Sequence, residues 1–203
     1  MKKMLVFSLV LLFLTGFVVL PSGLRAAQPT SPADKSAPSY DMKAQSALDL
    51  QELQKKIVGL AEAIPADKYT WRPEPGTRSV SELFLHIAAA NYNFPTMMSG
   101  VAPAAGFEGK GFEKSTTDKA KIIEQLNKSF SYAIAAVNNM SNADFAKPET
   151  KLGPDANDGD VIYLMVTHTH EHLGQSIAYA RMNGVMPPWT AEAEKKYPKA
   201  AAE

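Results

Sequence analysis

Residues 160–184, DVIYLMVTHTHEHLGQSIAYARMNG, hold three of the four histidines in this chain of 203 residues. Apolar residues recur along this run at helical spacing, which predicts an α-helix. Positions four apart lie one turn apart on the same face of a helix, with about 5–6 Å between their Cβ atoms. His168 and His172 can therefore bind one metal ion together, whereas His170 points to the other side of the helix.

The predicted helix is apolar on two nearly opposite sides. One side combines the histidine pair with Val161, Met165, Gln175 and Tyr179. The other side carries Ile162, Val166, Leu173 and Ile177. A helix that is apolar all round is usually buried on both sides. Two interpretations stay open: the helix lies centrally in its domain, or one side packs against a second subunit in a homodimer.

Three other stretches with helical periodicity precede this one. They run from about residue 40 to residue 64, from Ser79 to about residue 94, and from residues 115–118 to beyond Val137. Ser79 and Glu82 form the pattern of a capping box at the start of the second stretch. The apolar stripe of the third stretch consists of Ile123, Leu126, Phe130, Ile134 and Val137.

The connections between these stretches are long and rich in Gly, Pro and polar residues, as over 101–115 and 142–160. Gly184 follows the last predicted helix, and Pro187 and Pro188 then mark a stop. No stretch alternates convincingly with a period of two, as a half-buried strand would. The sequence therefore predicts an all-α fold, an up-and-down-type four-helix bundle with long loops.

The first 27 residues have the pattern of a secretory signal peptide. The chain opens with Met-Lys-Lys, continues with an apolar run over residues 4–20, and reaches the small pair Ala26-Ala27. A basic start, an apolar centre and a small-residue end define such a leader. An uncleaved anchor is the alternative, because about 17 apolar residues are near the lower bound for a membrane span. After cleavage we expect no stable membrane span and a secreted or periplasmic protein.

Residues 28–39 are rich in Pro, Ser and Ala, which predicts a flexible linker before a domain over residues 40–203. Removing the leader takes away Lys2, Lys3, Arg25 and no acid, so the 21 Lys and Arg fall to 18 against 21 acids. A mildly acidic chain without a basic patch argues against nucleic acid as a partner. The chain has no cysteine, which excludes disulfides and thiolate ligands.

His86 lies beside the apolar face of the second predicted helix. A lone histidine in such a place is more often a hydrogen-bonded core residue than a metal ligand. However, three protein ligands and one open position are the usual arrangement of a catalytic zinc site. Ligands in a bundle come from facing helices, which suits His86 together with His168 and His172.

Residues 168–172 also match H-x-x-E-H, a zinc-protease pattern in which Glu171 would be the general base. Only 31 residues follow His172, too few for the large α/β domain of such proteases. Glu171 also lies roughly 80° round the helix from the midpoint of the histidine pair. A protease is therefore disfavoured, while Glu171 stays a weak candidate base for another metal-assisted reaction.

The body of the chain, from about residue 40 to residue 190, resembles the DinB-like (DinB/YfiT-like) family of four-helix metal-binding bundles. The resemblance rests on three groups of residues. They are Trp71-Arg-Pro73, then Ser79-Val-Ser-Glu-Leu-Phe-Leu-His86-Ile-Ala-Ala-Ala-Asn91, and His168-Thr-His-Glu-His172-Leu-Gly-Gln175 with Tyr179, Gly184 and Pro187-Pro188. The single histidine of the second helix combined with H-x-x-x-H-x-G-Q in the fourth is the specific part.

This resemblance implies a divalent metal ion, most often zinc or nickel, held by His86, His168 and His172. Members of the family often carry a second histidine directly before the last ligand, where this chain has Glu171. Gln175 follows His172 by about one helical turn, and we expect it to contact the outer side of a ligand or the substrate.

The family includes thiol-dependent transferases and metal-dependent hydrolases. An exported protein leaves the compartment where thiol cofactors are abundant, so a thiol-dependent transferase is the less favoured alternative. We expect a metal-dependent hydrolase that acts on a small-molecule substrate through metal-bound water. The other hypotheses are a non-catalytic metal- or small-ligand-binding module of the cell envelope, and a dimerising bundle whose histidines are only core residues.

Overall fold

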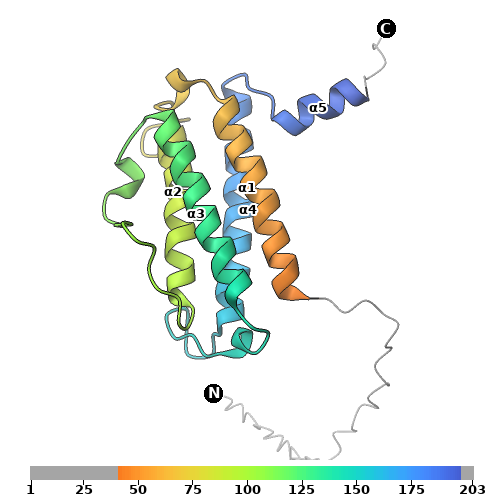
Figure 1. Cartoon of the computed structure of the whole chain (residues 1–203). Helices are drawn as coiled ribbons and strands as arrows, with labels where there is room; N and C mark the ends of the chain where they lie inside the picture. Colours follow the sequence, from red (N-terminus) through yellow and green to blue (C-terminus); the bar gives the residue numbers. More distant parts are fainter. Residues whose placement is uncertain (1–40, 198–203) are drawn as a thin grey trace, which may run out of the picture. The chain divides into compact units, whose positions relative to one another are not determined.

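The computed structural model describes residues 41–197, and over this range the secondary structure is helical. The predicted signal peptide and the predicted linker, residues 1–39, lie outside the described residues. The α-helices are α1 (Met42–Ala63), α2 (Val80–Asn93), α3 (Lys119–Asn139), α4 (Asp158–Met182) and α5 (Pro188–Lys196). The 3-10 helices are η1 (Ala66–Lys68), η2 (Phe94–Met97), η3 (Phe112–Lys114) and η4 (Asp144–Ala146). The first four α-helices lie side by side as a bundle (Figure 1), which confirms the all-α prediction.

Contacts near their ends show that α1 and α3 are antiparallel. Near the start of α1, the ammonium group of Lys43 donates a hydrogen bond of 2.6 Å to the carbonyl of Met140, just after α3. At the start of α3, the ammonium group of Lys119 donates one of 2.8 Å to the carbonyl of Ile64, just after α1.

The order of the helices differs from the up-and-down order that the sequence predicted. The hydroxyl of Tyr69 donates to the carbonyl of Ala61 at 2.7 Å, and the carbonyl of Tyr69 accepts from Ser81 N–H at 2.9 Å, so α2 begins where α1 ends. Because α3 begins at this same end, α2 and α3 run parallel. The segment 94–118 therefore returns along the length of the bundle (Figure 1). Apolar periodicity reports which face of a helix is buried and not its direction, so the sequence could not supply this order.

Helix α4 runs antiparallel to α2, which brings the two histidine-bearing helices face to face. At the end of α4, the hydroxyl of Tyr179 donates to the carbonyl of Arg78, just before α2, at 3.1 Å. At the start of α4, the buried carboxylate of Asp158 accepts from Ser99 N–H, beyond the end of α2, at 3.1 Å. The bundle order is thus up, down, down, up.

Each bundle helix starts at a residue whose side chain caps the free backbone N–H groups of the first turn. The capping residues are Asp41, Ser79, Asp118 and Asn157. Such caps favour helix starts because the first four N–H groups of a helix have no partner within it. The capping box predicted for Ser79 and Glu82 is confirmed, and α4 begins with a second one. Gly184 has a φ of 73°, the left-handed conformation expected just after a helix.

The core lies between the four bundle helices and is made of aliphatic and aromatic side chains. In α3 the buried face is turned slightly from the predicted stripe: Ile122 and Ala133 are buried, whereas Ile123 and Ile134 are half-buried. This helix packs against both α1 and α2, so its buried face is set by two neighbours. On α4 both predicted apolar sides contact the core of this domain. This supports the interpretation that α4 is apolar on two sides because it lies centrally in its domain, and not because one side packs against a second subunit.

Helix α5 was not expected, because Pro187 and Pro188 indicated a stop. Pro188 occupies the first turn of α5. Proline is well tolerated there, since its missing N–H would have no helical partner and its φ already suits a helix. The two prolines therefore end one helix and start the next, and half-buried Trp189 packs against the core.

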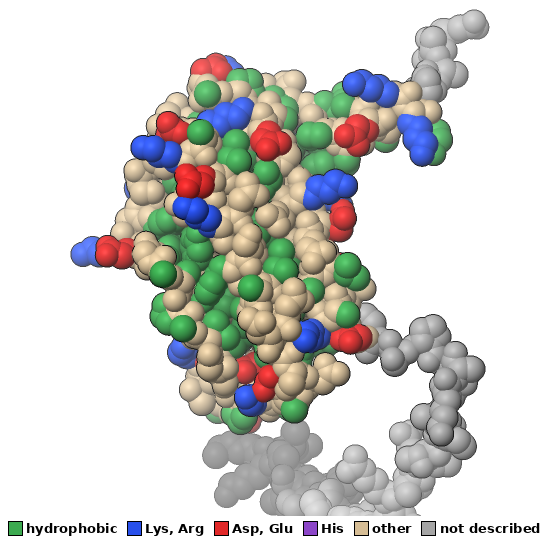
Figure 2. Space-filling view, in the orientation of Figure 1, with side chains coloured by type: hydrophobic (Ala, Val, Ile, Leu, Met, Phe, Trp, Pro, Cys, Tyr) green, Lys and Arg blue, Asp and Glu red, His purple; other side chains and the backbone are tan. Residues whose placement is uncertain are grey.

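The surface offers two further observations. On the face shown in Figure 2, hydrophobic side chains gather over α3 and the segment that connects it to α2, and charged side chains are more frequent towards the ends of the bundle. Within residues 41–197, none of the helices has the length and apolar character needed to cross a membrane.

Replacing Ser79 by alanine should lower the free energy of unfolding by about 1 kcal/mol, because the first turn of α2 loses its cap. The Ser79 hydroxyl, which is buried, accepts from Glu82 N–H at 3.3 Å. Urea denaturation followed by far-ultraviolet circular dichroism measures the change. Ser115→Ala, at an exposed serine just after η3, is the matched control. Equal stabilities of the two variants would contradict the prediction.

Candidate metal centre

Three imidazoles meet where α2 faces α4. His86 comes from the middle of α2, and His168 and His172 come from adjacent turns of α4. The Nε2 atom of His168 lies 3.2 Å from that of His86 and 3.1 Å from that of His172. One ring nitrogen from each histidine can thus approach a common point, and these nitrogens lie within 4.8 Å of one another. The sequence-predicted trio is brought together.

The two neighbouring polar residues of α4 are not brought to this point. His170 and Glu171 are both exposed to solvent. Within the described residues, Glu171 forms no hydrogen bond with any of the three clustered histidines. Its carboxylate acts on His172 only through space, where its charge favours the protonated form. The structure thus gives no support to Glu171 as a base that contacts the histidine nitrogens.

A chain of hydrogen bonds fixes which nitrogen of His172 carries its proton. The carbonyl of Arg78 can only accept, so the hydroxyl of Tyr179 donates to it at 3.1 Å. The Tyr179 oxygen then accepts from the amide nitrogen of Gln175 at 3.2 Å. This turns the amide oxygen of Gln175 towards Nδ1 of His172, 2.9 Å away. Nδ1 must donate to that oxygen, which leaves the lone pair of Nε2 directed at the common point.

Glu113 does the same for His86. One of its carboxylate oxygens lies 2.6 Å from Nδ1 of His86, and the other accepts from Nε of Arg78 at 2.8 Å. Burial alone would raise the pKa of Glu113, but the hydrogen bonds from Arg78 and His86 outweigh it and hold the pKa below its ordinary value. The carboxylate therefore accepts the proton at Nδ1 of His86, and in the neutral ring this leaves the lone pair on Nε2.

His168 completes the cluster. Its Nδ1 is buried and has no hydrogen-bond partner among residues 41–197, and the ring of Phe94 packs edge-on at 5.2 Å between centroids. Burial, followed by the proximity of His172 and His86, lowers the pKa of His168 to about 4. Burial also lowers the pKa of His172. Both imidazoles are therefore neutral near pH 7, which is the form that binds metal.

The directions of the lone pairs decide what the cluster can hold. The Nε2 atoms of His86 and His172 direct lone pairs at a shared point. A proton on Nε2 of His168 can be donated to only one of these two acceptors. A buried acceptor without a donor is unfavourable, so the three nitrogens do not satisfy one another as plain core residues. A cation at the shared point would satisfy all three at once. The residues present therefore fit a divalent metal ion with nitrogen ligands.

Sequence reasoning found Gln175 but missed the roles of Glu113, Arg78 and Tyr179. Glu113 lies in η3, within the long connection between α2 and α3 and 27 positions from His86, and no sequence motif surrounds it. The sequence places Tyr179 on the same side of the helix as the histidine pair, where packing is the expected role. Its ring does pack edge-on against Trp71, with 5.4 Å between centroids, and this contact helps to place the hydroxyl. Trp71, the first residue of the Trp71-Arg-Pro73 group, thus contacts the site through Tyr179.

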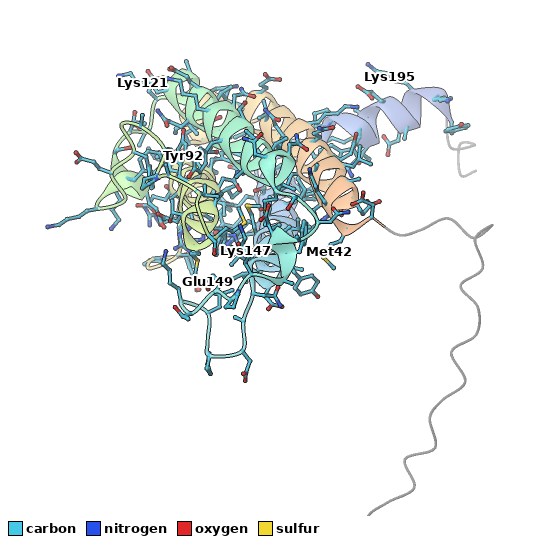
Figure 3. All side chains as sticks on the ribbon, turned by 60° about the horizontal axis from the view of Figure 1, so that its bottom comes forward. Met42, Tyr92, Lys121, Lys147, Glu149 and Lys195 are labelled. Atoms are coloured by element: carbon cyan, nitrogen blue, oxygen red, sulfur yellow. The ribbon has the colours of Figure 1, made fainter. Side chains whose placement is uncertain are left out.

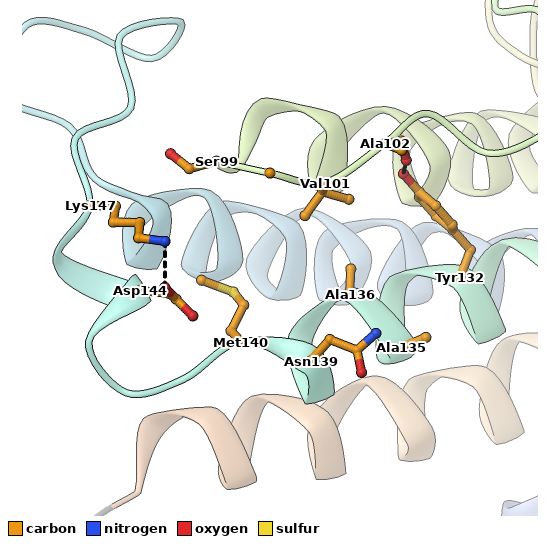
Figure 4. Close-up of a pocket in the computed structure, with 11 residues that line it drawn as sticks. Ser99, Val101, Ala102, Tyr132, Ala135, Ala136, Asn139, Met140, Asp144 and Lys147 are labelled. Atoms are coloured by element: carbon orange, nitrogen blue, oxygen red, sulfur yellow. Dashed lines mark hydrogen bonds and ion pairs between the residues drawn. The ribbon is translucent and has the colours of Figure 1, made fainter.

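A separate pocket of about 310 Å³ lies at the other end of the bundle, between α3 and residues 99–102 (Figure 4). Two of its lining residues form an ion pair with each other, because the ammonium group of Lys147 lies 2.6 Å from the carboxylate of Asp144. That contact lowers the pKa of Asp144 to about 2. Figure 3 shows Lys147 and Glu149 on the loop between α3 and α4, a part of the molecule distinct from the histidine cluster.

The fold and the site together define a helical bundle in which three histidines converge. Comparison with known proteins identifies the family to which such a bundle belongs. Residues 49–176 match the family model of the DinB superfamily. This range includes the three clustered histidines and Gln175, and the chain belongs to the DinB superfamily.

A solved structure shares the fold. The crystal structure of a DinB-like protein from Bacillus cereus ATCC 10987 superimposes with a TM-score of 0.59 at 16% sequence identity, over 72% of this chain and 93% of that one. At this identity the likeness shows the fold alone. Among curated proteins, none matches this chain.

Replacing Glu113 by glutamine should lower the affinity for a divalent metal by roughly 10- to 100-fold, because the neutral amide holds Nδ1–H of His86 less strongly. Competition against a chromophoric chelator measures the affinity. Glu108→Gln, in the same connecting segment and exposed, is the matched control and should bind like the parent. Unchanged affinity in Glu113→Gln would show that the carboxylate does not position His86.

Replacing Tyr179 by phenylalanine should release the amide of Gln175 and let His172 adopt the tautomer protonated at Nε2. Nitrogen-15 NMR of the histidine rings in metal-free protein reports the tautomer directly. Metal affinity should fall by roughly tenfold, at the lower end of effects outside the ligands themselves. Tyr163→Phe, at a residue of the same helix that is 68% exposed, is the control. An unaltered His172 tautomer in Tyr179→Phe would refute the chain of hydrogen bonds.

Proposed function

We propose that this protein binds a divalent metal ion through His86, His168 and His172 and acts as an exported metal-dependent hydrolase on a small molecule. The observation that carries the proposal is the convergence of three Nε2 atoms. Outer hydrogen bonds to Glu113 and Gln175 turn two of them inwards as lone-pair donors. Membership of the DinB superfamily is consistent with a metal-binding bundle.

The ligand chemistry supports zinc or nickel. Imidazole suits both ions, whereas magnesium and calcium prefer oxygen ligands. When bound, such an ion supplies Lewis-acid polarisation of a substrate oxygen and lowers the pKa of water towards neutrality. The protein's own contribution is to keep the rings of His168 and His172 neutral, to orient His86 and His172 through outer hydrogen bonds, and to limit solvent around the cluster. Three protein ligands leave a tetrahedral site one open position for water or substrate.

Export is proposed from the leader pattern of residues 1–27, with a secreted or periplasmic protein as the result. An exported protein leaves the compartment where thiol cofactors are abundant, and a hydrolytic reaction needs no such cofactor. This favours a hydrolase over the thiol-dependent transferase that the family resemblance also allows. A homodimer is not required by the site, because all three histidines come from one chain.

A second candidate function is a non-catalytic metal-binding module of the cell envelope. One observation favours it: neither carboxylate that acts on the histidines is placed to serve as a general base at the shared point. Glu113 is held by Arg78 and His86, and Glu171 is exposed. Within the described residues, no carboxylate is hydrogen-bonded to an Nε2 atom of the trio. A site without a general base fits binding better than catalysis.

Elemental analysis of the untagged mature chain should find close to one zinc or nickel ion per molecule, and His86→Ala and His168→Ala should each lose it. Removing one of three ligands leaves too few donors for tight binding. His170→Ala is the matched control, because this exposed histidine of the same helix does not reach the cluster. Absence of metal in the parent after reconstitution, or its retention in His168→Ala, would refute the ligand assignment.

A screen of esterase, amidase and phosphatase substrates separates the two candidate functions. We expect a hydrolytic activity that rises with metal occupancy, disappears with a chelator and is absent in His168→Ala. A metal-loaded protein that stays inactive across the screen, with full metal content, would favour the binding module.

A further inference from the structure

A second cavity, of about 540 Å³, adjoins the histidine cluster. We call it the arginine pocket. It is formed by the loop before α2, the first turn of α2, η3 and the later part of α4. Its lining includes the polar and charged residues Arg72, Arg78, Glu82, Glu113, Lys114 and Gln175. Its volume is in the range that holds small-molecule ligands.

The arginine pocket lies about one helical turn from the histidines, on the same faces of the same helices. Glu82 precedes His86 by four positions on α2, and Gln175 follows His172 by three positions on α4. Because α2 and α4 are antiparallel, both steps lead towards the same end of the bundle, by roughly 5.4 Å per turn. Gln175 also touches a histidine and lines the pocket at once. A ligand in the pocket would thus lie next to the candidate metal centre.

The charges in the arginine pocket do not cancel. Its lining carries three cations, Arg72, Arg78 and Lys114, against the two carboxylates of Glu82 and Glu113. A divalent ion on three neutral imidazoles would add further positive charge beside it. This balance favours a ligand with a negative charge.

The two carboxylates are already occupied by other partners. One oxygen of Glu82 accepts from Ser79 N–H at 2.8 Å and lies 3.2 Å from Nη2 of Arg72. The carboxylate of Glu113 serves Arg78 and His86. Neither has the freedom to neutralise a further cation.

The cations, in contrast, keep donors free. Arg72 uses Nη1 for the carbonyl of Thr77 and Nη2 for Glu82, which leaves Nε. Arg78 uses Nε and Nη2 for Glu113, which leaves Nη1. Lys114 is exposed, and no carboxylate of the described residues lies within ion-pair distance of it. Guanidinium and ammonium donors of this kind bind carboxylate and phosphate groups.

We propose that the arginine pocket binds the carboxylate or phosphate group of a small anionic substrate and so places the rest of that substrate beside the histidine cluster. Arg72 and Lys114 hold the anion, and Arg78 positions Glu113. The inference rests on the proposed function for the role of the histidines. The binding of the anion itself does not depend on a metal and can be tested without one.

Isothermal titration of metal-free protein at low ionic strength, with inorganic phosphate and with succinate as separate probes, tests the pocket. We expect saturable binding of at least one probe, and the tighter probe indicates which anionic group the pocket prefers. Lys114→Gln should weaken that binding by about tenfold, as loss of one charged hydrogen bond implies. Lys195→Gln, at a lysine in the last turn of α5 that does not line the pocket, should bind like the parent.

Arg72→Gln provides a second test, with its melting temperature measured alongside because this side chain also ties the loop to Glu82. Weakened binding in both pocket variants, with parental affinity in Lys195→Gln, supports the pocket. Equal affinities in all variants, or no saturable binding of either probe, overturns it. A parent that binds a probe but no metal would keep the pocket and refute the hydrolase, whereas one that binds metal but neither probe would refute the pocket alone.

Discussion

The interaction on which the site depends is the contact between two antiparallel helices that each bury imidazole. Helices α2 and α4 place the Nε2 atom of His168 about 3 Å from those of His86 and His172, with all three nitrogens within 4.8 Å of one another. Buried acceptors at this distance repel unless a proton or a cation lies between them. The backbone carbonyl of Arg78 can only accept a hydrogen bond. This fixes which group donates in each of the hydrogen bonds that lead through Tyr179 and Gln175 to His172.

The return of the chain along the bundle supplies the second half of the site. Because α2 and α3 are parallel, the connection between them travels back towards the start of α2. On that path η3 brings Glu113 against His86 and Arg78. A direct hairpin between antiparallel helices would need only a short loop and would carry no residue past the middle of α2. The long connection is therefore a part of the candidate metal centre as well as a link.

The arginine pocket and the histidine cluster share residues, which gives the site two layers. The carbonyl of Arg78 accepts from Tyr179, whose oxygen accepts from the glutamine that contacts His172, and the guanidinium of Arg78 donates to the carboxylate beside His86. The Gln175 side chain faces His172 and also lines the pocket. Hydrogen bonds therefore connect residues that line the arginine pocket to the rings of His86 and His172.

The sequence by itself determined the features that depend on local spacing. Four helices, the capping box at Ser79 and the pairing of His168 with His172 follow from a period of 3.6 residues and known capping chemistry, and the same spacing places Gln175 about one turn beyond His172. Tertiary structure decided what joins distant segments: the parallel course of α2 and α3, the start of α5 at Pro188, and the contacts of Glu113 and Tyr179. These depend on which helix ends meet in space, and apolar periodicity along one helix carries no information about its partner's direction.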